Sequence, residues 1–303
     1  MSGDHAVDRA TEAFVAHRNL LFTIAYEMLG SAADAEDVLQ ETWLRWVQVD
    51  LDQVCDERAY LIRITTRQAL NRLRMMSRRK ESYVGPWLPE PLLTAPDVAQ
   101  DVELAESVSM AVMLVLETLS PTERAVFVLH EVFDVGYDEI AAAVDKSLAA
   151  VRQIAHRARR HVDARRPRQV VSQREKRAAL ESFVRALEDG DLQGLLDVLA
   201  PEVVYMGDGG GVKHAVLRPI VGSDKVARLL VSRLTFLQSE NPTPVAFGPT
   251  LVNGSPALAI HLDGEVDAIM TARVEDGRIT GLYAVRNPEK LSHIASENPL
   301  TLQ

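Results

Sequence analysis

The 303-residue sequence lacks the features that would assign it to several common classes of protein. Its single cysteine, Cys55, excludes an intramolecular disulfide framework and cysteine-rich zinc sites. No apolar run approaches the roughly 20 residues of a membrane-spanning helix, and the longest, Met110–Leu116, lies inside an amphipathic pattern. The N-terminus has charges but no apolar segment typical of a secretory signal, so we interpret the chain as cytosolic.

The sequence also lacks internal repeats, low-complexity tracts and a pattern of metal ligands. Several of its histidines are scattered without ligand spacing, namely His5, His17, His130, His161 and His293. Met206 and Met270 alternate with other apolar residues, which is typical of a core. We therefore expect no metal and no cofactor, in a chain long enough for two or three compact domains.

Charge is unevenly distributed along a chain whose net charge is −10. The segment from Arg58 to Lys80 has eight basic residues and no acidic one, and the segment from Arg152 to Arg168 has seven arginines and one acid. Residues 34–41 hold four acids and no base. Two basic runs on helical patterns favour a nucleic-acid partner, with solvated helix faces as the plain alternative.

Helices are expected over most of residues 10–163. Residues 10–80 have no proline and only Gly30 as a helix breaker, which predicts a C-cap there and a new helix capped by Ser31 or Asp34. A third helix is expected from about Glu57 to Met76. An apolar stripe predicts another helix through Leu104, Val108, Val112, Val115 and Leu119. A Ser-Pro pair at 120–121 then starts the next.

A proline-rich segment, residues 81–100, separates these helical regions. Five residues there are incompatible with a helix interior: Gly85, Pro86, Pro89, Pro91 and Pro96. Its apolar residues are unusual for a linker: Trp87, Leu88, Leu92 and Leu93. We therefore expect this linker to dock on another part of the protein.

Residues 137–161 have the pattern of a helix-turn-helix. A short helix, Tyr137–Val144, precedes a turn at Asp145-Lys146, and Ser147 can cap the second helix. Its outward face is expected to present Arg152, Gln153, His156, Arg157, Arg159 and Arg160. Arginine and glutamine are the standard readers of guanine and adenine in the major groove. A helical hairpin with a basic surface remains the alternative.

The remaining sequence, about 172–303, predicts an α+β domain. Helices are expected at about 174–187, 192–199 and 223–234, and strands at 257–262, 265–274 and 279–285. Asp263-Gly264 and Asp276-Gly277 separate the strands, and Asp-Gly is a strong hairpin signal. Helices packed on one curved antiparallel sheet are the expected architecture.

Long motifs now resemble a known family. Three of them, 119–129, 136–141 and 151–160, resemble domain four of the extracytoplasmic-function sigma factors, whereas 34–46 and 59–74 resemble domain two. The motifs Trp87-Leu-Pro-Glu-Pro91, Asp208-Gly-Gly-Gly211 and Asn287-Pro-Glu-Lys-Leu291 resemble the subgroup with a fused C-terminal SnoaL-like domain. Val212 precedes Lys213, where that subgroup often has lysine directly after the glycines.

The resemblance implies a multidomain protein with two all-α sigma domains and a cone-shaped α+β SnoaL-like (nuclear transport factor two-like) domain. The expected parts are domain two (8–81), the linker (82–100), domain four (101–166), the SnoaL-like domain (172–292) and a tail (293–303). It implies an alternative sigma factor that binds core RNA polymerase and directs transcription from specific promoters. The attached domain is expected to modulate activity in cis, in place of a separate anti-sigma protein.

The resemblance also implies four sets of site residues. Polymerase binding is expected at Asp34, Asp37, Gln40, Glu41 and Trp43. The −10 element is expected to contact Arg63, Arg67, Asn71, Arg72 and Arg74. The −35 element is expected to contact Ser147, Arg152, Gln153, His156, Arg157 and Arg160. Interdomain regulation is expected at Trp87, Leu88, Pro89, Glu90, Pro91, Asp208, Gly209, Gly210, Gly211, Asn287, Pro288 and Leu291.

Three alternatives stay open at this point. The third domain could sense a small ligand in its cavity. It could also retain isomerase-like catalysis, for which the candidate residues are Tyr205, Asp208, His214, His261 and Asp267. The whole chain could instead be a ligand-sensing helix-turn-helix regulator, although such a protein has no need of the acidic helix at 34–46 or the basic helix at 58–80.

Overall fold

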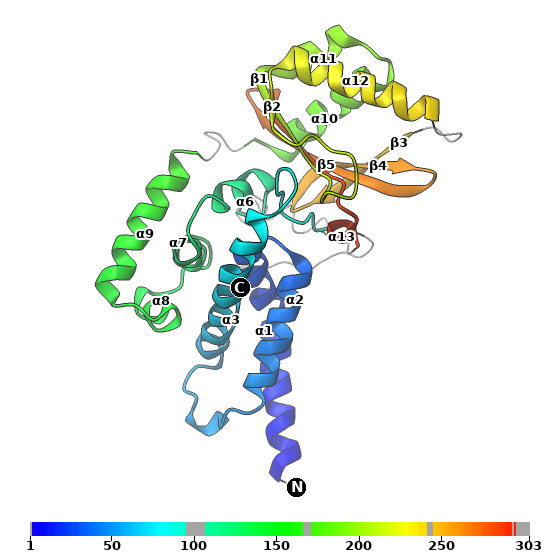
Figure 1. Ribbon diagram of the computed structural model, residues 1–303. Coiled ribbons are helices and arrows are strands. Elements are labelled where there is room, and N and C mark those ends of the chain that lie inside the picture. The colour runs from blue at the N-terminus through cyan, green and yellow to red at the C-terminus, as the bar shows by residue number, and fades with distance from the viewer. Residues whose placement is uncertain (1, 95–106, 166–170, 241–244, 293, 295–303) are drawn as a thin grey trace. The chain divides into compact units, whose positions relative to one another are not determined.

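The computed structural model describes residues 2–94, 107–165, 171–240, 245–292 and 294. The chain divides into two compact units, shown in Figure 1. The first holds Met1–Glu81 and Val112–Arg166, and the second holds Ser82–Ala111 and Pro167–Asn298. The proline-rich linker thus belongs with the C-terminal domain. No described helix is both long and apolar enough to cross a membrane.

The first part of unit one is a helical bundle. Its elements are α1 (Ser2–Leu29), α2 (Ala32–Trp46), the 3-10 turn η1 (Leu51–Gln53) and α3 (Glu57–Glu81). Gly30 has φ +69 and ends α1, and the Ser31 hydroxyl accepts a hydrogen bond from the Asp34 amide, as expected for the next cap. The fully buried Trp46 donates its Nε1–H to the Ala10 carbonyl at 2.8 Å and closes the bundle.

The second part of unit one contains the predicted helix-turn-helix. Its elements are α6 (Met110–Leu116), α7 (Pro121–Phe127), the π-helical turn η2 (Val128–Val132), α8 (Tyr137–Val144) and α9 (Leu148–Asp163). Ser120 and Glu123 form a capping box at the start of α7. Asp145 takes φ +55 in the turn, and Ser147 caps α9. Aspartate tolerates this left-handed conformation, so the turn does not need glycine.

The helix predicted through Leu104 to Leu119 is wrong in its described part, because it is interrupted at Val108 and Ser109 and ends before Leu119. The backbone turns at Val108 and Ser109, and α6 spans only Met110–Leu116. The Val108 carbonyl accepts a hydrogen bond from the Asn253 side chain, and Val108 belongs to unit two. Leu104 lies outside the described residues.

Unit two is an α+β domain, which confirms the expected fold class. Its helices are α10 (Gln173–Glu188), α11 (Leu192–Val198), α12 (Ser223–Glu240) and α13 (Pro288–Leu291). Its strands are β1 (Leu199–Asp208), β2 (Ile220–Val221), β3 (Ala246–Val252), β4 (Ser255–Leu262), β5 (Glu265–Glu275) and β6 (Arg278–Val285). The sheet order is β2-β1-β6-β5-β4-β3, and only the β1–β6 pairing is parallel.

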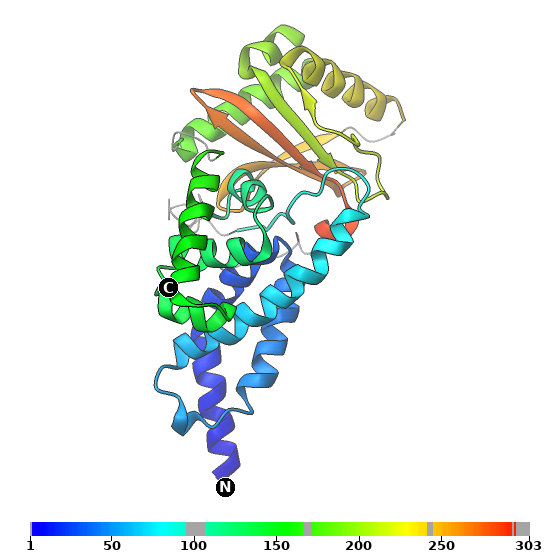
Figure 2. The same cartoon turned by 60° about the vertical axis from the view of Figure 1, so that its left-hand side comes forward.

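The two faces of this sheet have different partners, because side chains alternate along each strand. Leu258 and Met270 face a core formed with α10, α11 and α12, the three helices that cover one face in Figures 1 and 2. Ala257 and Ile269 belong to a smaller cluster, against which Leu291 of α13 packs. The cavity and the linker contacts described below therefore belong to different parts of one domain.

Candidate functional site

The exposed face of α2 carries the predicted polymerase-binding residues. Asp37, Gln40 and Glu41 are exposed. Leu44, with 59% of its surface exposed, follows Asp37 by seven residues, or about two helical turns, and so lies on the same face. Trp43 is half-buried, with its ring 5.3 Å from that of Phe14. The acidic face thus surrounds an apolar residue that the sequence interpretation missed.

The predicted −10 residues on α3 lie in different environments. Asn71 and Arg74 are exposed, and the Arg63 guanidinium lies 4.5 Å from the centre of the Tyr60 ring. Arg72 pairs with Asp34 at 2.6 Å and also with Asp37, so it joins the predicted −10 helix to the predicted polymerase-binding helix.

Arg67 connects the predicted −10 helix to the helix-turn-helix within unit one. Its guanidinium donates to the carbonyl oxygens of Ala142 at 2.8 Å and Ala143 at 3.4 Å. These carbonyls belong to the last turn of α8, where a cation is favoured because the helix carbonyls there are unpaired. The Arg67 guanidinium, which is expected to bind DNA, is therefore engaged in hydrogen bonds within the protein.

The outward face of α9 is basic and accessible. Arg152, Gln153, His156, Arg157 and Arg160 are exposed along this face. The Ser147 hydroxyl accepts from the Ala150 amide at 3.3 Å and so also acts as the helix cap. A neighbouring arginine, Arg159, forms a two-point ion pair with Glu131 at 2.6 and 2.8 Å.

Asp208, at the end of β1, is the centre of a buried anchor for the linker. Its carboxylate is fully buried and accepts hydrogen bonds from the Tyr83 hydroxyl at 2.5 Å and the Leu88 amide at 2.9 Å. Lys290 of α13 pairs with it at 2.7 Å and also donates to the Leu88 carbonyl at 2.5 Å. The Lys290 ammonium lies 3.5 Å from the centre of the Trp87 ring, a cation–π contact.

The linker residues of the predicted regulatory set are largely buried. Leu88, Pro89, Glu90 and Pro91 are buried. Burial, together with the Asp208 carboxylate, raises the pKa of Tyr83, which therefore stays protonated and donates at neutral pH. We refer to Tyr83, Trp87, Leu88, Asp208 and Lys290 as the Asp208 anchor.

The glycine motif shapes the backbone next to this anchor. Gly210 has φ +65, and its amide donates to Asp208 at 3.1 Å. A Cβ atom at Gly210 would lie 2.5 Å from the side chain of Asn287, and one at Gly209 would lie 2.1 Å from the Lys213 carbonyl oxygen. These close approaches, and not only a turn, require glycine. Asn287 itself donates to the Tyr83 hydroxyl at 2.9 Å and caps α13.

A second anchor holds the far end of the linker. The Asn253 side chain accepts from the Leu92 amide at 3.0 Å and donates to the Val108 carbonyl at 2.9 Å. Its backbone amide donates to the Leu92 carbonyl, and Leu93 forms an antiparallel bridge with Val252 at the edge of the sheet. Asn253 therefore joins the linker at Leu92 to the chain at Val108, sixteen residues later.

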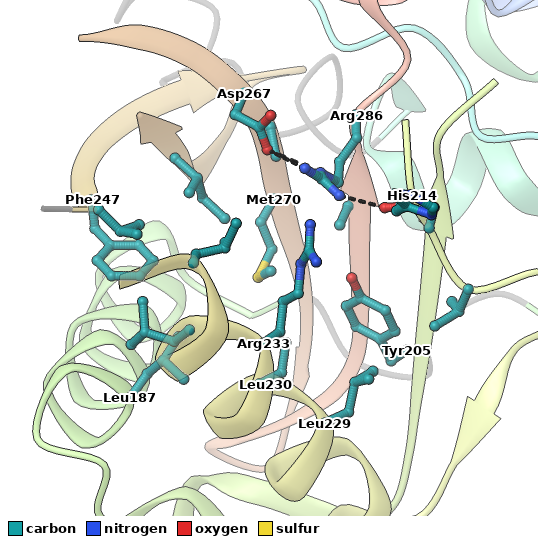
Figure 3. A pocket seen from close by; sticks show the side chains of 18 residues that line it. Leu187, Tyr205, His214, Leu229, Leu230, Arg233, Phe247, Asp267, Met270 and Arg286 are labelled. Carbon is teal, nitrogen blue, oxygen red and sulfur yellow. Dashed lines mark hydrogen bonds and ion pairs between the residues drawn. The ribbon is translucent and has the colours of Figure 1, made fainter. Parts of the chain in front are cut away.

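A cavity lies in the C-terminal domain, on the face of the sheet covered by α10 and α12 (Figure 3). Of the residues considered for catalysis, Tyr205, His214 and Asp267 line it. Asp267 pairs with Lys213 at 2.9 Å and with Arg286 at 2.7 Å. Burial opposes its charge, but Lys213 and Arg286 outweigh burial and lower its pKa. Asp208 instead serves the linker anchor.

Sequence reasoning missed Tyr83, Lys290 and Asn253 as contacts of the linker. Lys290 stood inside a quoted motif, and Asn253-Gly254 is a hairpin signal as strong as the two Asp-Gly pairs. Nothing in the local pattern of Tyr83 distinguishes it. Its partners Asp208 and Asn287 follow it by more than a hundred residues.

Two family models match the helical parts of the chain. Sigma-70 region 2 matches residues 13–79, and Sigma-70, region 4 matches residues 109–162. The ECF RNA polymerase sigma factor SigJ of Mycobacterium tuberculosis (strain ATCC 25618 / H37Rv) is 36% identical over 295 residues, 92% of each chain. The probable ECF RNA polymerase sigma factor SigI of Mycobacterium tuberculosis (strain CDC 1551 / Oshkosh) is 31% identical over 293 residues, 96% of this chain and 97% of that protein.

The crystal structure of the Mycobacterium tuberculosis extracytoplasmic function sigma factor SigJ has a similar fold. It superposes with a TM-score of 0.75 and 33% sequence identity, and the match covers 94% of this chain and 99% of that one. The similarity to SigJ, in sequence and in fold, therefore extends over both the helical domains and the C-terminal domain. The chain belongs to the extracytoplasmic-function (ECF) RNA polymerase sigma factors.

Proposed function

We propose that this ECF sigma factor binds core RNA polymerase through α2 and reads the −10 and −35 elements through α3 and α9. The observation that carries the proposal is the separation of charge in unit one, with an exposed acidic face on α2 and an exposed basic face on α9. Sigma factors bind core polymerase and promoter DNA, and complementary charge suits both partners. Run-off transcription with purified core polymerase tests it directly.

Leu44 is expected to be part of the polymerase contact. An exposed leucine surrounded by acidic residues fits an interface whose apolar centre has a polar rim. Leu44→Asp should weaken binding to core polymerase by about 10- to 100-fold, equivalent to roughly 1–3 kcal/mol. Val15→Asp is the matched control, since Val15 is 63% exposed on α1. Equal binding of both variants to core polymerase in a competition assay would show that Leu44 is not part of the interface.

Arg152 is expected to read the −35 element. Its guanidinium lies 5.9 Å from the Tyr137 ring and is otherwise accessible. Loss of a base contact costs roughly 1–3 kcal/mol, so Arg152→Ala should lower promoter-specific transcription by about 5- to 150-fold. Arg174→Ala removes the same charge from an exposed position of α10. This control should change promoter-specific transcription less than about twofold. A uniform loss on promoters with and without an intact −35 element would indicate a phosphate contact instead.

The C-terminal domain is proposed to regulate the sigma domains in cis. The linker that joins α3 to α6 is covalently continuous with both sigma domains, and the Asp208 and Asn253 anchors hold it at two places. Docking thus restricts the conformations open to the tether, and its release would shift the population that is competent for polymerase. No separate anti-sigma protein is needed for such control.

The regulatory proposal is tested by transcription with the linker released. Asp208→Asn and Trp87→Ala both weaken the Asp208 anchor without touching unit one. A change in promoter-specific transcript yield, in the same direction for both variants, supports control in cis. Unchanged yield, with the linker shown to be released, would argue that the anchor only stabilises the fold.

A second proposed activity of this domain is the binding of a small ligand in the cavity. The observation that favours it is a cavity of about 240 Å³ with mostly apolar lining. We assign no catalysis to the cavity, because Asp267 is held in ion pairs that lower its pKa, whereas a general base of the isomerase type needs a free carboxylate.

A further inference from the structure

The cavity of the C-terminal domain has the size and lining for a small apolar body. Its volume of about 240 Å³ exceeds the roughly 150 Å³ apolar cavity that accepts benzene. Most of its surface comes from α10, α12 and the sheet, through Leu187, Leu230, Leu234, Phe247, Ile260 and Met270. One or two rings, or a short acyl chain, match this space.

Two polar groups in the cavity have no hydrogen-bond partner among the described residues. Arg233 of α12 is half-buried, and its guanidinium makes only a ring contact, 5.6 Å from the centre of Phe236. The hydroxyl of Tyr205, on β1, is likewise without a hydrogen bond within the described part of the chain. Figure 3 shows both side chains directed toward the same end of the cavity, where Arg286 lies.

At the end of the cavity where Arg286 lies, the cation Arg233 forms no ion pair with a described residue. The lone carboxylate among the residues lining the cavity, Asp267, is already shared between Lys213 and Arg286. Arg233 therefore adds a positive charge that has no ion pair among the described residues, although the Asp267 charge acts on it at longer range. Burial and the neighbouring Arg286 charge lower the pKa of Arg233. An anion placed beside Arg233 would stabilise its charged form and so offset both effects. Burial also raises the pKa of Tyr205, which keeps its hydroxyl as a donor.

We infer that the cavity binds an apolar small molecule bearing one carboxylate, which accepts hydrogen bonds from the Arg233 guanidinium and the Tyr205 hydroxyl. A planar carboxylate fits the fork of an arginine, and Arg233 is the arginine of the cavity lining that forms no ion pair with a described residue. The inference rests on the ligand binding proposed above and does not depend on the role in transcription. The inference specifies the charged group of the ligand, whereas the shape of the cavity alone specifies only the size of its apolar part.

Matched pairs of carboxylic acids and primary amides separate head recognition from apolar burial. The intact protein is titrated by calorimetry with benzoate, cinnamate, 2-naphthoate and octanoate, and with the amide of each. We expect at least one acid to bind about tenfold or more tightly than its amide, since hydrogen bonds to charged groups contribute more than neutral ones. Phenyl phosphate tests whether a doubly charged head is preferred.

Two arginines on α12 provide the variant and its control. Arg233→Gln should reduce binding of the acid to the level of the amide and leave amide binding unchanged. Arg228→Gln should leave both within about twofold, because Arg228 is exposed, pairs with Asp224 and does not line the cavity. Unchanged thermal unfolding of Arg233→Gln verifies that the domain is intact.

The outcomes distinguish this inference from the ligand proposal on which it rests. Equal binding of an acid and its amide overturns the carboxylate site and keeps an apolar cavity that binds ligands. Tighter binding of phenyl phosphate overturns the choice of carboxylate. Loss of acid binding in Arg228→Gln as well as Arg233→Gln overturns the site on Arg233. Binding of no probe at millimolar concentration overturns both proposals.

Discussion

Asp208→Asn is expected to release the linker from the C-terminal domain. The substitution keeps the size of the side chain but removes its charge, and so it breaks the ion pair with the Lys290 ammonium, whose side chain is only 8% exposed. Breaking a buried ion pair by removing one partner costs about 3–5 kcal/mol. The Tyr83 hydroxyl and the Leu88 amide also lose a charged acceptor.

Hydrogen exchange measures this release locally. The Leu88 amide donates to Asp208, so exchange in a peptide covering residues 84–91 should accelerate by roughly 10²- to 10³-fold. Asp224→Asn is the control, since its ion pair with Arg228 is exposed on both sides, and little change is expected. Protection that survives Asp208→Asn would show that apolar burial of residues 88–92 alone holds the linker.

A double variant tests whether charge is the cause. Asp208→Asn combined with Lys290→Met removes both members of the buried pair, which is often close to neutral when the replacement packs well. We therefore expect the double variant to recover part of the protection that the single variant loses. Additive losses would instead assign the anchor to independent contacts.

Glu117→Gln is expected to destabilise unit one by about 3–5 kcal/mol. The Glu117 carboxylate pairs with Arg124 of α7 at 2.6 Å and also with Lys80 of α3. Arg124 is only 2% exposed and donates in addition to the Glu27 carbonyl at 2.9 Å. Without the Glu117 carboxylate, the buried Arg124 guanidinium would lose its ion pair and Lys80 would lose one of its charged contacts.

The effect should depend on pH in a defined direction. Burial opposes the charge of Glu117, but Arg124 and Lys80 outweigh burial and hold its pKa below its ordinary value. A carboxylate with a lowered pKa in the folded state stabilises the fold above its unfolded pKa, about 4.3. The difference between wild type and Glu117→Gln should therefore be full at neutral pH and shrink as the pH falls below about 4.3.

Urea unfolding, followed by hydrogen exchange in peptides from α1 and α3, checks this prediction. Glu12→Gln, at an exposed position of α1, is the control and should lie within about 0.5 kcal/mol of wild type. A Glu117→Gln variant as stable as the control would contradict the buried pair as a source of stability. Replacement of all three charged groups by Met or Leu should recover stability, because well-packed apolar side chains often replace a buried ion pair at no cost.

The sequence by itself determined the local structure and the family. The cap at Ser31, the break at Gly30, the helix-turn-helix and the two Asp-Gly hairpins follow from the preferences of single residues and short patterns, and the structure has all of them. The motifs of domains two and four sufficed for the family. The predicted helix is interrupted at Val108, whose carbonyl accepts a hydrogen bond from the Asn253 side chain, distant in sequence.

Only the tertiary structure decided which polar groups meet. Lys290 and Tyr83 reach Asp208 across 82 and 125 residues, and no local periodicity encodes such a distance. The same holds for Asp267, which forms its ion pairs with Lys213 and Arg286, while Arg233 forms none with a described residue. Local propensity is decided within a few neighbouring residues, whereas the pairing of buried charges depends on the packing of the whole domain, which brings them together and excludes water.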